Sequence, residues 1–185
     1  MTHRQKNKEK ISWFRALLYA IGIAFLVRTF LITPYTVSGA SMNPTLENGE
    51  RLFINKLAAS LGDIKHGDIV IIKNKEQAKK RHYVKRVIGL PGDTIEMKRD
   101  RLYINGKIIQ EPYLNHNLKQ AQEYDMLLTN DFGPMKVPEH FFFVMGDNRL
   151  INKDSRNGLG LISEKRIIGT SEFVMYPLKK MRHTN

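Results

Sequence analysis

The chain has 185 residues, enough for one membrane anchor and one compact domain with its own core. It contains no cysteine, which excludes disulfide scaffolds, thiolate metal sites and cysteine nucleophiles. Its formal net charge is +12, and the residues up to Arg15 supply +4 of this, from five basic side chains and one acidic one. We expect this charge to favour an anionic membrane or cell wall, with no nucleic-acid partner, since no basic face carries interleaved aromatic residues.

The first 33 residues predict a membrane anchor. Residues 1–10 form a basic cytoplasmic tail in this interpretation, and 11–33 form a single transmembrane helix. A bilayer core needs roughly 20 helical residues. The uncharged run 16–27 is too short by itself, but Ile11 to Ile32 supplies 22 residues if Arg15 and Arg28 extend toward opposite interfaces. Because basic residues precede the helix, we expect the N-terminus in the cytoplasm and the rest of the chain outside, at the cell membrane.

A cleavable signal peptide is an alternative interpretation of the same segment. A basic start, a short apolar run and small residues at Ser38 and Ala40 are typical of such peptides. Cleavage would then fall just before Ser41.

The following residues, 34–185, predict a mainly β domain. Short apolar stretches bounded by turn signals predict strands, and these lie at 51–56, 69–72, 82–88, 94–97, 101–104, 107–109, 141–145, 166–168 and 171–176. A helical turn within 54–61 is undecided, and 110–137 is polar, irregular and loop-rich, with the character of a small cap. Many short strands favour a barrel-like or coiled antiparallel sheet.

Ser41 and Lys85 are the candidate catalytic pair. A serine hydroxyl needs an adjacent base to accept its proton. His82 and His140 are the only plausible histidine bases, and neither lies in a Ser/His/Asp signature. A lysine serves instead when burial lowers its pKa from about 10.4. The plain alternatives are an ordinary surface loop at Ser41 and a solvent-facing lysine on a half-buried strand.

Strand alternation separates the two basic residues of the Lys85 strand. Lys85 shares its expected face with Tyr83 and Val87, so apolar neighbours flank it. Arg86 faces the other way and is available to pair with a carboxylate.

Two Asp/Arg pairs follow the strand 141–145: Asp147 with Arg149, and Asp154 with Arg156. We expect ion pairs and turn hydrogen bonds to tie this loop together and to hold the base strand and the nucleophile loop in register. Interleaved arginines and the lack of a nearby histidine disfavour a metal site.

Four motifs in this order resemble those of the bacterial type I signal peptidases, in the small form typical of Gram-positive species. They are Ser41-Met42 with Pro44-Thr45-Leu46, Gly67-Asp68-Ile69-Val70, Lys85-Arg86-Val87-Ile88-Gly89 with Pro91-Gly92-Asp93, and Gly146-Asp147-Asn148-Arg149 with Asp154-Ser155-Arg156. The resemblance covers nearly the whole chain.

The resemblance implies a membrane-bound endopeptidase without a cofactor, which removes signal peptides from secretory preproteins after Ala-X-Ala sites and works beside the lipid bilayer and the secretion translocon. Ser41 would be the nucleophile and Lys85 the general base. Further residues would have supporting roles: Asp147, Arg149, Asp154 and Arg156 in shaping the site, and Met42, Leu46 and Tyr83 in lining the pocket for small side chains at −1 and −3.

Two positions depart from the family pattern. Gly39 stands where many members have a serine whose hydroxyl stabilises the oxyanion, which leaves the main-chain N–H of Ser41 as the expected donor. Asn152 replaces a serine that hydrogen-bonds the lysine; its amide both donates and accepts, so it either orients Lys85 or misplaces it.

Three other hypotheses follow from the same features. Self-cleavage just before Ser41 is one. A self-cleaving repressor shares Ser/Lys chemistry but is soluble, which the expected anchor disfavours. A membrane-tethered β domain that binds preproteins without cutting them is the third.

Overall fold

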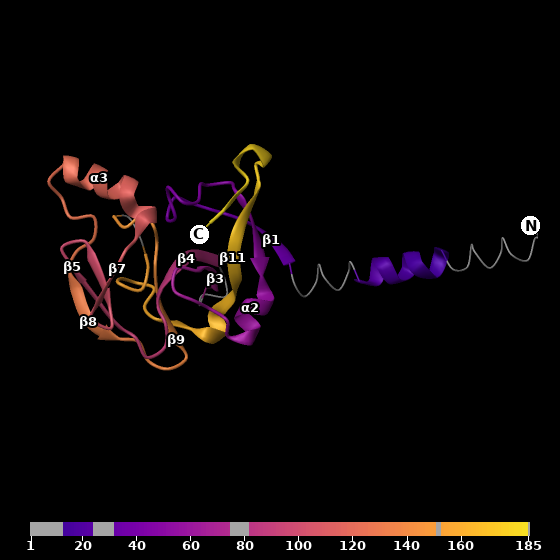
Figure 1. Cartoon of the computed structure of the whole chain (residues 1–185), viewed down its shortest axis with the longest axis horizontal. Helices are drawn as coiled ribbons and strands as arrows, with labels where there is room; N and C mark the ends of the chain where they lie inside the picture. Colours follow the sequence, from indigo (N-terminus) through magenta and orange to yellow (C-terminus); the bar gives the residue numbers. More distant parts are fainter. Residues whose placement is uncertain (1–12, 24–31, 75–81, 151–152, 185) are drawn as a thin grey trace, which may run out of the picture.

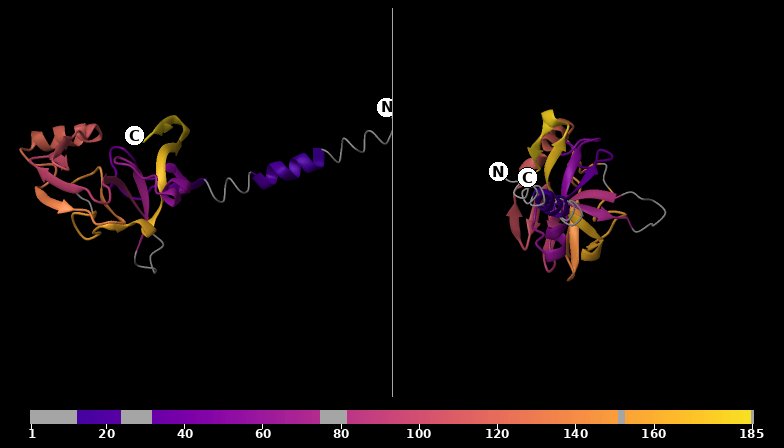
Figure 2. Two further views of the ribbon diagram at one scale, coloured as in Figure 1. Left: turned by 60° about the horizontal axis from the view of Figure 1, so that its bottom comes forward. Right: turned by 90° about the vertical axis from the view of Figure 1, so that its right-hand side faces the viewer.

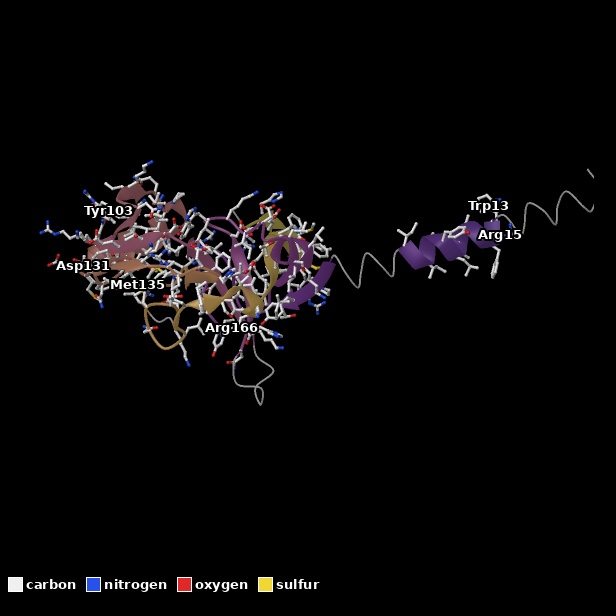
Figure 3. The ribbon with its side chains drawn as sticks, turned by 90° about the horizontal axis from the view of Figure 1, so that it is seen from below. Trp13, Arg15, Tyr103, Asp131, Met135 and Arg166 are labelled. Atoms are coloured by element: carbon white, nitrogen blue, oxygen red, sulfur yellow. The ribbon has the colours of Figure 1, made fainter. Side chains whose placement is uncertain are left out.

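The computed structural model describes residues 13–23, 32–74, 82–150 and 153–184. Residues 13–23 are helical, and Figure 3 shows Trp13 and Arg15 near the N-terminal end of this helical segment. Within the described ranges, none of the helices has the length and apolar character needed to cross a bilayer. The expected tail 1–10, and residues 11–12 and 24–31 of the expected anchor, lie outside the described residues.

The larger of two antiparallel sheets has eight strands (Figure 1). In chain order these are β1 (Ile32–Thr36), β2 (Arg51–Asn55), β3 (Ile69–Lys73), β4 (His82–Gly89), β9 (Phe141–Met145), β10 (Ile162–Ser163), β11 (Ile167–Tyr176) and β12 (Arg182–His183). Their spatial order is β1-β2-β11-β3-β4-β9-β10, with β12 beside β11. The path does not return to β1 among the described strands, so the sheet is open. The expected mainly β antiparallel class is confirmed, and closure into a barrel is not found.

The smaller sheet has the order β7-β6-β5-β8. Its strands are β5 (Thr94–Lys98), β6 (Arg101–Ile104), β7 (Lys107–Ile109) and β8 (Phe132–Lys136). Helix α3 (Asn115–Glu123) follows a 3₁₀ turn, Pro112–Leu114, and lies at the same end of the domain as this sheet in Figures 1 and 2. The expected irregular excursion 110–137 therefore contains a helix and a strand.

Two boundaries differ from the sequence prediction. Ile32 and Thr33, expected to end the membrane helix, begin β1, which pairs with β2 from Ile32 opposite Asn55 to Thr36 opposite Arg51. Residues 166–168 and 171–176, expected as two strands, belong mostly to the single strand β11, which begins at Ile167. Register shifts in its pairing with β3 and with β2 bend it past both neighbours.

The short helix α2 (Lys56–Leu61), left undecided by the sequence, has clear caps. The Asn55 side chain accepts hydrogen bonds from the N–H groups of Leu57 and Ala58, and Gly62 ends the helix with φ of 72°. Further along the chain, Arg166 (labelled in Figure 3) donates from Nε to the Lys73 carbonyl at 3.1 Å and so joins the start of β11 to the end of β3.

Strand β4 contributes to all three large apolar clusters of the domain. Val87 packs in a cluster with Val70 and Val144, Ile88 packs in a second cluster, which lies against the smaller sheet, and Val84 packs in a third, with Leu52 and other residues. A strand packed on both faces and paired on both edges is held firmly in register. Lys85 and Arg86 therefore lie on a strand that both packing and pairing hold in place.

Candidate active site

Lys85 is a buried lysine in the middle of β4. Lys85 pairs with Val70 of the neighbouring strand β3, and it is only 2% exposed. Burial lowers the pKa of Lys85 to about 8; Asp154 and Asp147 act against this shift, and Arg156 adds to it. A substantial fraction of this amine is therefore neutral near pH 8, as a general base must be.

Ser41 lies in the nucleophile loop, defined here as residues 38–46. Ser41 itself is partly exposed, whereas the next residue, Met42, and Leu46 are fully buried. Both pack in the same apolar cluster as Val84 of β4. The loop is thus anchored by its apolar side chains on the strand that carries Lys85.

Polar contacts fix the same loop to the segment that follows β9. The N–H of Asn148 donates to the Ser41 carbonyl at 3.1 Å, and its side-chain amide donates to the Ala40 carbonyl at 3.2 Å. The Thr45 hydroxyl donates to Asp147 Oδ2 at 2.5 Å. The backbone at the nucleophile is therefore held by Asp147 and Asn148.

Asp147 also holds the base strand. Arg86 donates from Nε to Asp147 Oδ1 at 3.0 Å and from Nη2 to Oδ2 at 2.7 Å, and both residues are buried. A third donor of the same guanidinium, Nη1, reaches the Gly67 carbonyl at 2.7 Å. The nucleophile loop and β4 thus meet at one carboxylate, and Arg86 faces away from Lys85 as the alternation predicts.

The second acidic residue of this segment, Asp154, is also fully buried. It accepts from Arg156 Nε at 3.0 Å and Nη2 at 2.8 Å, and Arg156 Nη2 reaches the Arg149 carbonyl at 2.9 Å. Asp154 and Arg156 therefore pair as expected. Asn152 lies outside the described residues, so its effect on Lys85 stays a prediction.

Arg149 does not pair with Asp147 in the expected way, because its ion pair is with Glu111. Burial acts to lower the pKa of Arg149, but the adjacent Glu111 carboxylate outweighs it and raises that pKa. The Tyr113 hydroxyl also donates to Glu111, and the Tyr113 ring lies 4.0 Å from the Arg86 guanidinium carbon. Sequence reasoning missed Glu111 and Tyr113, since both lie in the polar stretch read as an irregular cap.

Helix α3 is joined to the nucleophile loop by one side chain. Asn117 donates to the carbonyls of Asn43, at 3.3 Å, and Asp147, at 3.1 Å. Between the helix and the loop lies a groove of about 520 Å³. It is lined by Asn43, Pro44, Glu47, His116, Asn117, Gln120, Ala121, Tyr124, Met126, Leu128, Asn148 and Leu150. We call this the α3 groove. One of its lining residues, Asn43, follows Ser41 by two positions in the chain.

The three residues expected to line a pocket do not share one cluster. Met42 and Leu46 pack with Val84, whereas Tyr83 packs against the cluster on the other face of β4. None of the three lines the α3 groove. Their contact with substrate stays a prediction.

Gly39 has a backbone conformation that favours glycine. Its φ is +94°, and its N–H donates to Asn48 Oδ1 at 2.9 Å. The N–H of Gly39 is therefore engaged within the loop. A serine at this position would have to adopt a strained backbone.

The two histidines considered as bases have other contacts. The His82 ring packs edge-on against Tyr35 with centroids 5.8 Å apart. The exposed His140 lies 3.4 Å from a Glu164 carboxylate oxygen. Neither contact involves the nucleophile loop, whereas Lys85 is buried with a lowered pKa, so Lys85 is the better candidate.

Comparison with known proteins places this arrangement in a family. Residues 10–176 match the family described as signal peptidase, peptidase S26. The chain is 56% identical to signal peptidase I P of Bacillus subtilis subsp. natto, over 97% of this chain and 96% of that protein. It is 54% identical to signal peptidase I T of Bacillus subtilis (strain 168), over 99% and 94%.

A solved structure is similar as well. The crystal structure of a signal peptidase I from Enterococcus faecalis V583 aligns with a TM-score of 0.51 and 33% identity, covering 58% of this chain and 95% of that one. Sequence and fold therefore agree with the motif resemblance. The chain belongs to the signal peptidase family, peptidase S26, and is a serine peptidase.

Proposed function

We propose that this peptidase cleaves signal peptides from exported preproteins with a Ser41/Lys85 dyad. The observation that carries the proposal is Lys85: a buried amine with a pKa lowered to about 8, on a strand that the Arg86–Asp147 pair joins to the nucleophile loop. Burial of an amine costs free energy, and a buried amine with a strongly lowered pKa beside charged partners is characteristic of a functional site.

In the proposed reaction, neutral Lys85 accepts the Ser41 hydroxyl proton as Oγ attacks the carbonyl carbon of the scissile peptide bond. The lysine then gives this proton to the leaving nitrogen, the C–N bond breaks, and an ester to Ser41 remains. In the second half of the cycle, water attacks the ester carbonyl while neutral Lys85 takes its proton, and the lysine returns that proton to Ser41 Oγ as the C–O bond to the serine breaks. The protons balance over the cycle, and Lys85 ends as it began.

Negative charge develops on the carbonyl oxygen during both attacks. Because the N–H of Gly39 already donates to Asn48, we assign the Ser41 main-chain N–H as a donor to this oxyanion. Asp154 and Asp147 oppose the effect of burial on Lys85. Their charges keep the Lys85 pKa from falling further, so that the amine still binds the proton it must carry.

For the substrate, we propose small residues at −1 and −3, with Met42, Leu46 and Tyr83 close to them. We propose a separate role for the α3 groove, which none of these three residues lines: its partly apolar wall beside the nucleophile loop suits a polypeptide that extends from the cut bond. We also propose that the segment before β1, residues 11–31, anchors the protein in the cell membrane, with the catalytic domain outside the cytoplasm near the translocon.

The test is cleavage of a preprotein bearing an Ala-X-Ala site, in detergent, from pH 6 to 10. We expect Ser41→Ala and Lys85→Met to abolish cleavage. Ser38→Ala and Lys73→Met are matched controls, because each replaces the same residue type at an exposed neighbouring position, and both should cleave like the wild type. Cleavage that survives Ser41→Ala or Lys85→Met overturns the dyad, and a wild type that does not cut overturns the function.

A further inference from the structure

The C-terminal segment 177–184 lies beyond the residues that match the family, 10–176. It contains a 3₁₀ turn, Leu178–Lys180, and the short strand β12, whose Arg182 and His183 pair with Val174 and Phe173 of β11. Figure 1 shows this yellow segment turning back toward the purple loop that precedes β2. Thr184 completes the attachment to the sheet, since its N–H donates to the Glu172 carbonyl and its hydroxyl to that of Ser171, both at 3.0 Å.

Arg182 reaches from this segment to the nucleophile loop. Its Nη1 donates to Glu50 Oε1 at 2.7 Å and its Nη2 to Glu50 Oε2 at 2.9 Å, which makes a two-bond ion pair. The same Nη2 donates to the main-chain carbonyl of Thr45 at 2.6 Å. Glu50 is only 2% exposed, so this pair is largely shielded from water on the acidic side.

Glu50 in turn contacts the residues on either side of the nucleophile loop. Its Oε2 accepts the N–H of Glu47 at 2.9 Å, and its main-chain carbonyl accepts the N–H of Val37 at 2.8 Å. Burial acts to raise the pKa of Glu50, but the hydrogen bonds and charge of Arg182 outweigh it and lower that pKa. The carboxylate is therefore ionised at neutral pH, and the ends of the loop are fixed around it.

Thr45 is held on both sides. Its carbonyl accepts from Arg182, and its hydroxyl donates to Asp147, which binds Arg86 beside Lys85. A continuous series of hydrogen bonds thus runs from the C-terminal segment through the nucleophile loop to the base strand.

We propose that Arg182 is a positioning residue for peptide-bond cleavage, which sets the nucleophile loop against the strand of the base. The inference rests on the proposed function of Ser41 and Lys85. Arg182 touches neither side chain; it acts through Thr45 and Glu50. Its importance follows from the geometry of attack, in which an error of about 1 Å costs on the order of 10²-fold in rate.

The test compares Arg182→Gln and Arg182→Lys with Lys180→Gln in the full chain, in detergent, on the Ala-X-Ala preprotein. Lys180→Gln is the matched control, because it removes the partly exposed pair with Glu47 from the same segment. We expect Arg182→Gln to lower kcat by roughly 10- to 100-fold with KM changed less than about twofold. Arg182→Lys should lie between, because one ammonium cannot replace the forked guanidinium. Lys180→Gln should match the wild type.

Two further readouts separate positioning from folding. Thermal unfolding, followed in parallel, should show Arg182→Gln fully folded at the assay temperature. The midpoint of the pH–rate profile should stay near 8, because the surroundings of Lys85 are unchanged. In a double-mutant cycle with Glu50→Gln, the two losses in kcat should be less than additive, since both substitutions disrupt one contact.

A kcat for Arg182→Gln equal to that of Lys180→Gln overturns the proposal, as does a loss fully explained by the unfolded fraction. Additive losses in the cycle also overturn it. Failure of the proposed function gives a different result, in which Ser41→Ala still cleaves or the wild type does not.

Discussion

The guanidinium of Arg86 and the carboxylate of Asp147 form a two-bond ion pair at 3.0 and 2.7 Å, with both residues at most 3% exposed. The same carboxylate accepts the Thr45 hydroxyl. One buried acid therefore joins the strand of Lys85 to the loop of Ser41. We therefore expect loss of this acid to affect both stability and cleavage.

We expect Asp147→Asn to lower the free energy of unfolding by about 3–5 kcal/mol, because it leaves the Arg86 charge buried without compensation. Denaturant unfolding measures this difference. The control is Asp63→Asn, whose partner Lys65 is exposed, and it should unfold like the wild type. Equal stabilities for the two variants would contradict the structural role of the pair.

The rate of cleavage should rise with pH and reach half its maximum near pH 8. In the proposed dyad the neutral amine of Lys85 is the active form, so acid should remove activity as it protonates that amine. A pH–rate profile of kcat/KM measures the midpoint in the free enzyme. A midpoint near 6.5 would point to a histidine base instead.

Arg156→Gln should move this midpoint upward. Arg156 lowers the pKa of Lys85, and its removal also frees Asp154 from an ion pair, so both effects favour the protonated lysine. The measurement is the same profile, with Arg51→Gln as control, because Arg51 is an exposed arginine of β2 that pairs with β1. A midpoint that falls would show that Arg156 acts on Lys85 in another way.

Lys85→Met should be more stable than the wild type at pH 7. The folded pKa of about 8 lies below the ordinary 10.5, so the unfolded chain binds more protons between these values. The free energy of unfolding of the wild type therefore rises between pH 8 and 10.5, and that of the methionine variant does not. At pH 7 the variant should unfold with a free energy higher than that of the wild type by roughly 3 kcal/mol at most. Unfolding curves at pH 7 and pH 10 test the sign; a less stable Lys85→Met would refute it.

Gly39→Ser should slow cleavage, although many family members have serine there. With φ at +94°, a side chain at this position strains the loop by about 1 kcal/mol. Gly39→Ala separates strain from chemistry, since it adds a Cβ without a hydroxyl. A serine variant that is faster than the wild type, beside a slow alanine variant, would show that the hydroxyl does reach the oxyanion.

Met126→Asp should raise KM for a full preprotein by roughly tenfold. A bound polypeptide would bury the new charge against an apolar wall, which weakens binding by about 1–2 kcal/mol. Met126 is 54% exposed in the α3 groove, and Ile108, 51% exposed on β7, offers a matched control outside the groove. Ile108→Asp should leave KM unchanged. Equal KM values for the two variants would remove the groove from the substrate path.

Most of the main strands were predictable, because their apolar stretches are short, rich in β-branched residues and bounded by turns. The strand β4 and its alternation follow directly from local sequence, as does the pairing of Asp154 with Arg156. The strand β1 was not predictable, since Ile32 and Thr33 continue an apolar run that resembles a membrane helix. The helix α3 has few apolar residues, so no periodicity marks it.

The partners of the buried charges were harder still. Nothing in the sequence distinguishes Glu111 from other acids, and only the folded chain places it against Arg149. The same holds for Arg182 and Glu50, which are 132 positions apart. Local pattern determines which residues are buried; the long-range topology determines which charges meet.

Lys85 and Arg86 are neighbours in sequence with opposite requirements. In the proposed mechanism the first must release its proton near neutral pH, whereas arginine keeps its own at any pH a protein tolerates. Because adjacent residues of a strand face opposite sides, a slip of β4 by one position would turn each of them to the other face. A slip in one direction would put Arg86, a permanent cation, in the place of Lys85, and a slip in the other direction would put Lys85 in the place of Arg86, facing Asp147. The apolar clusters on both faces of β4 therefore set the chemistry of the enzyme as well as its stability, since they decide which of two cations can become a base.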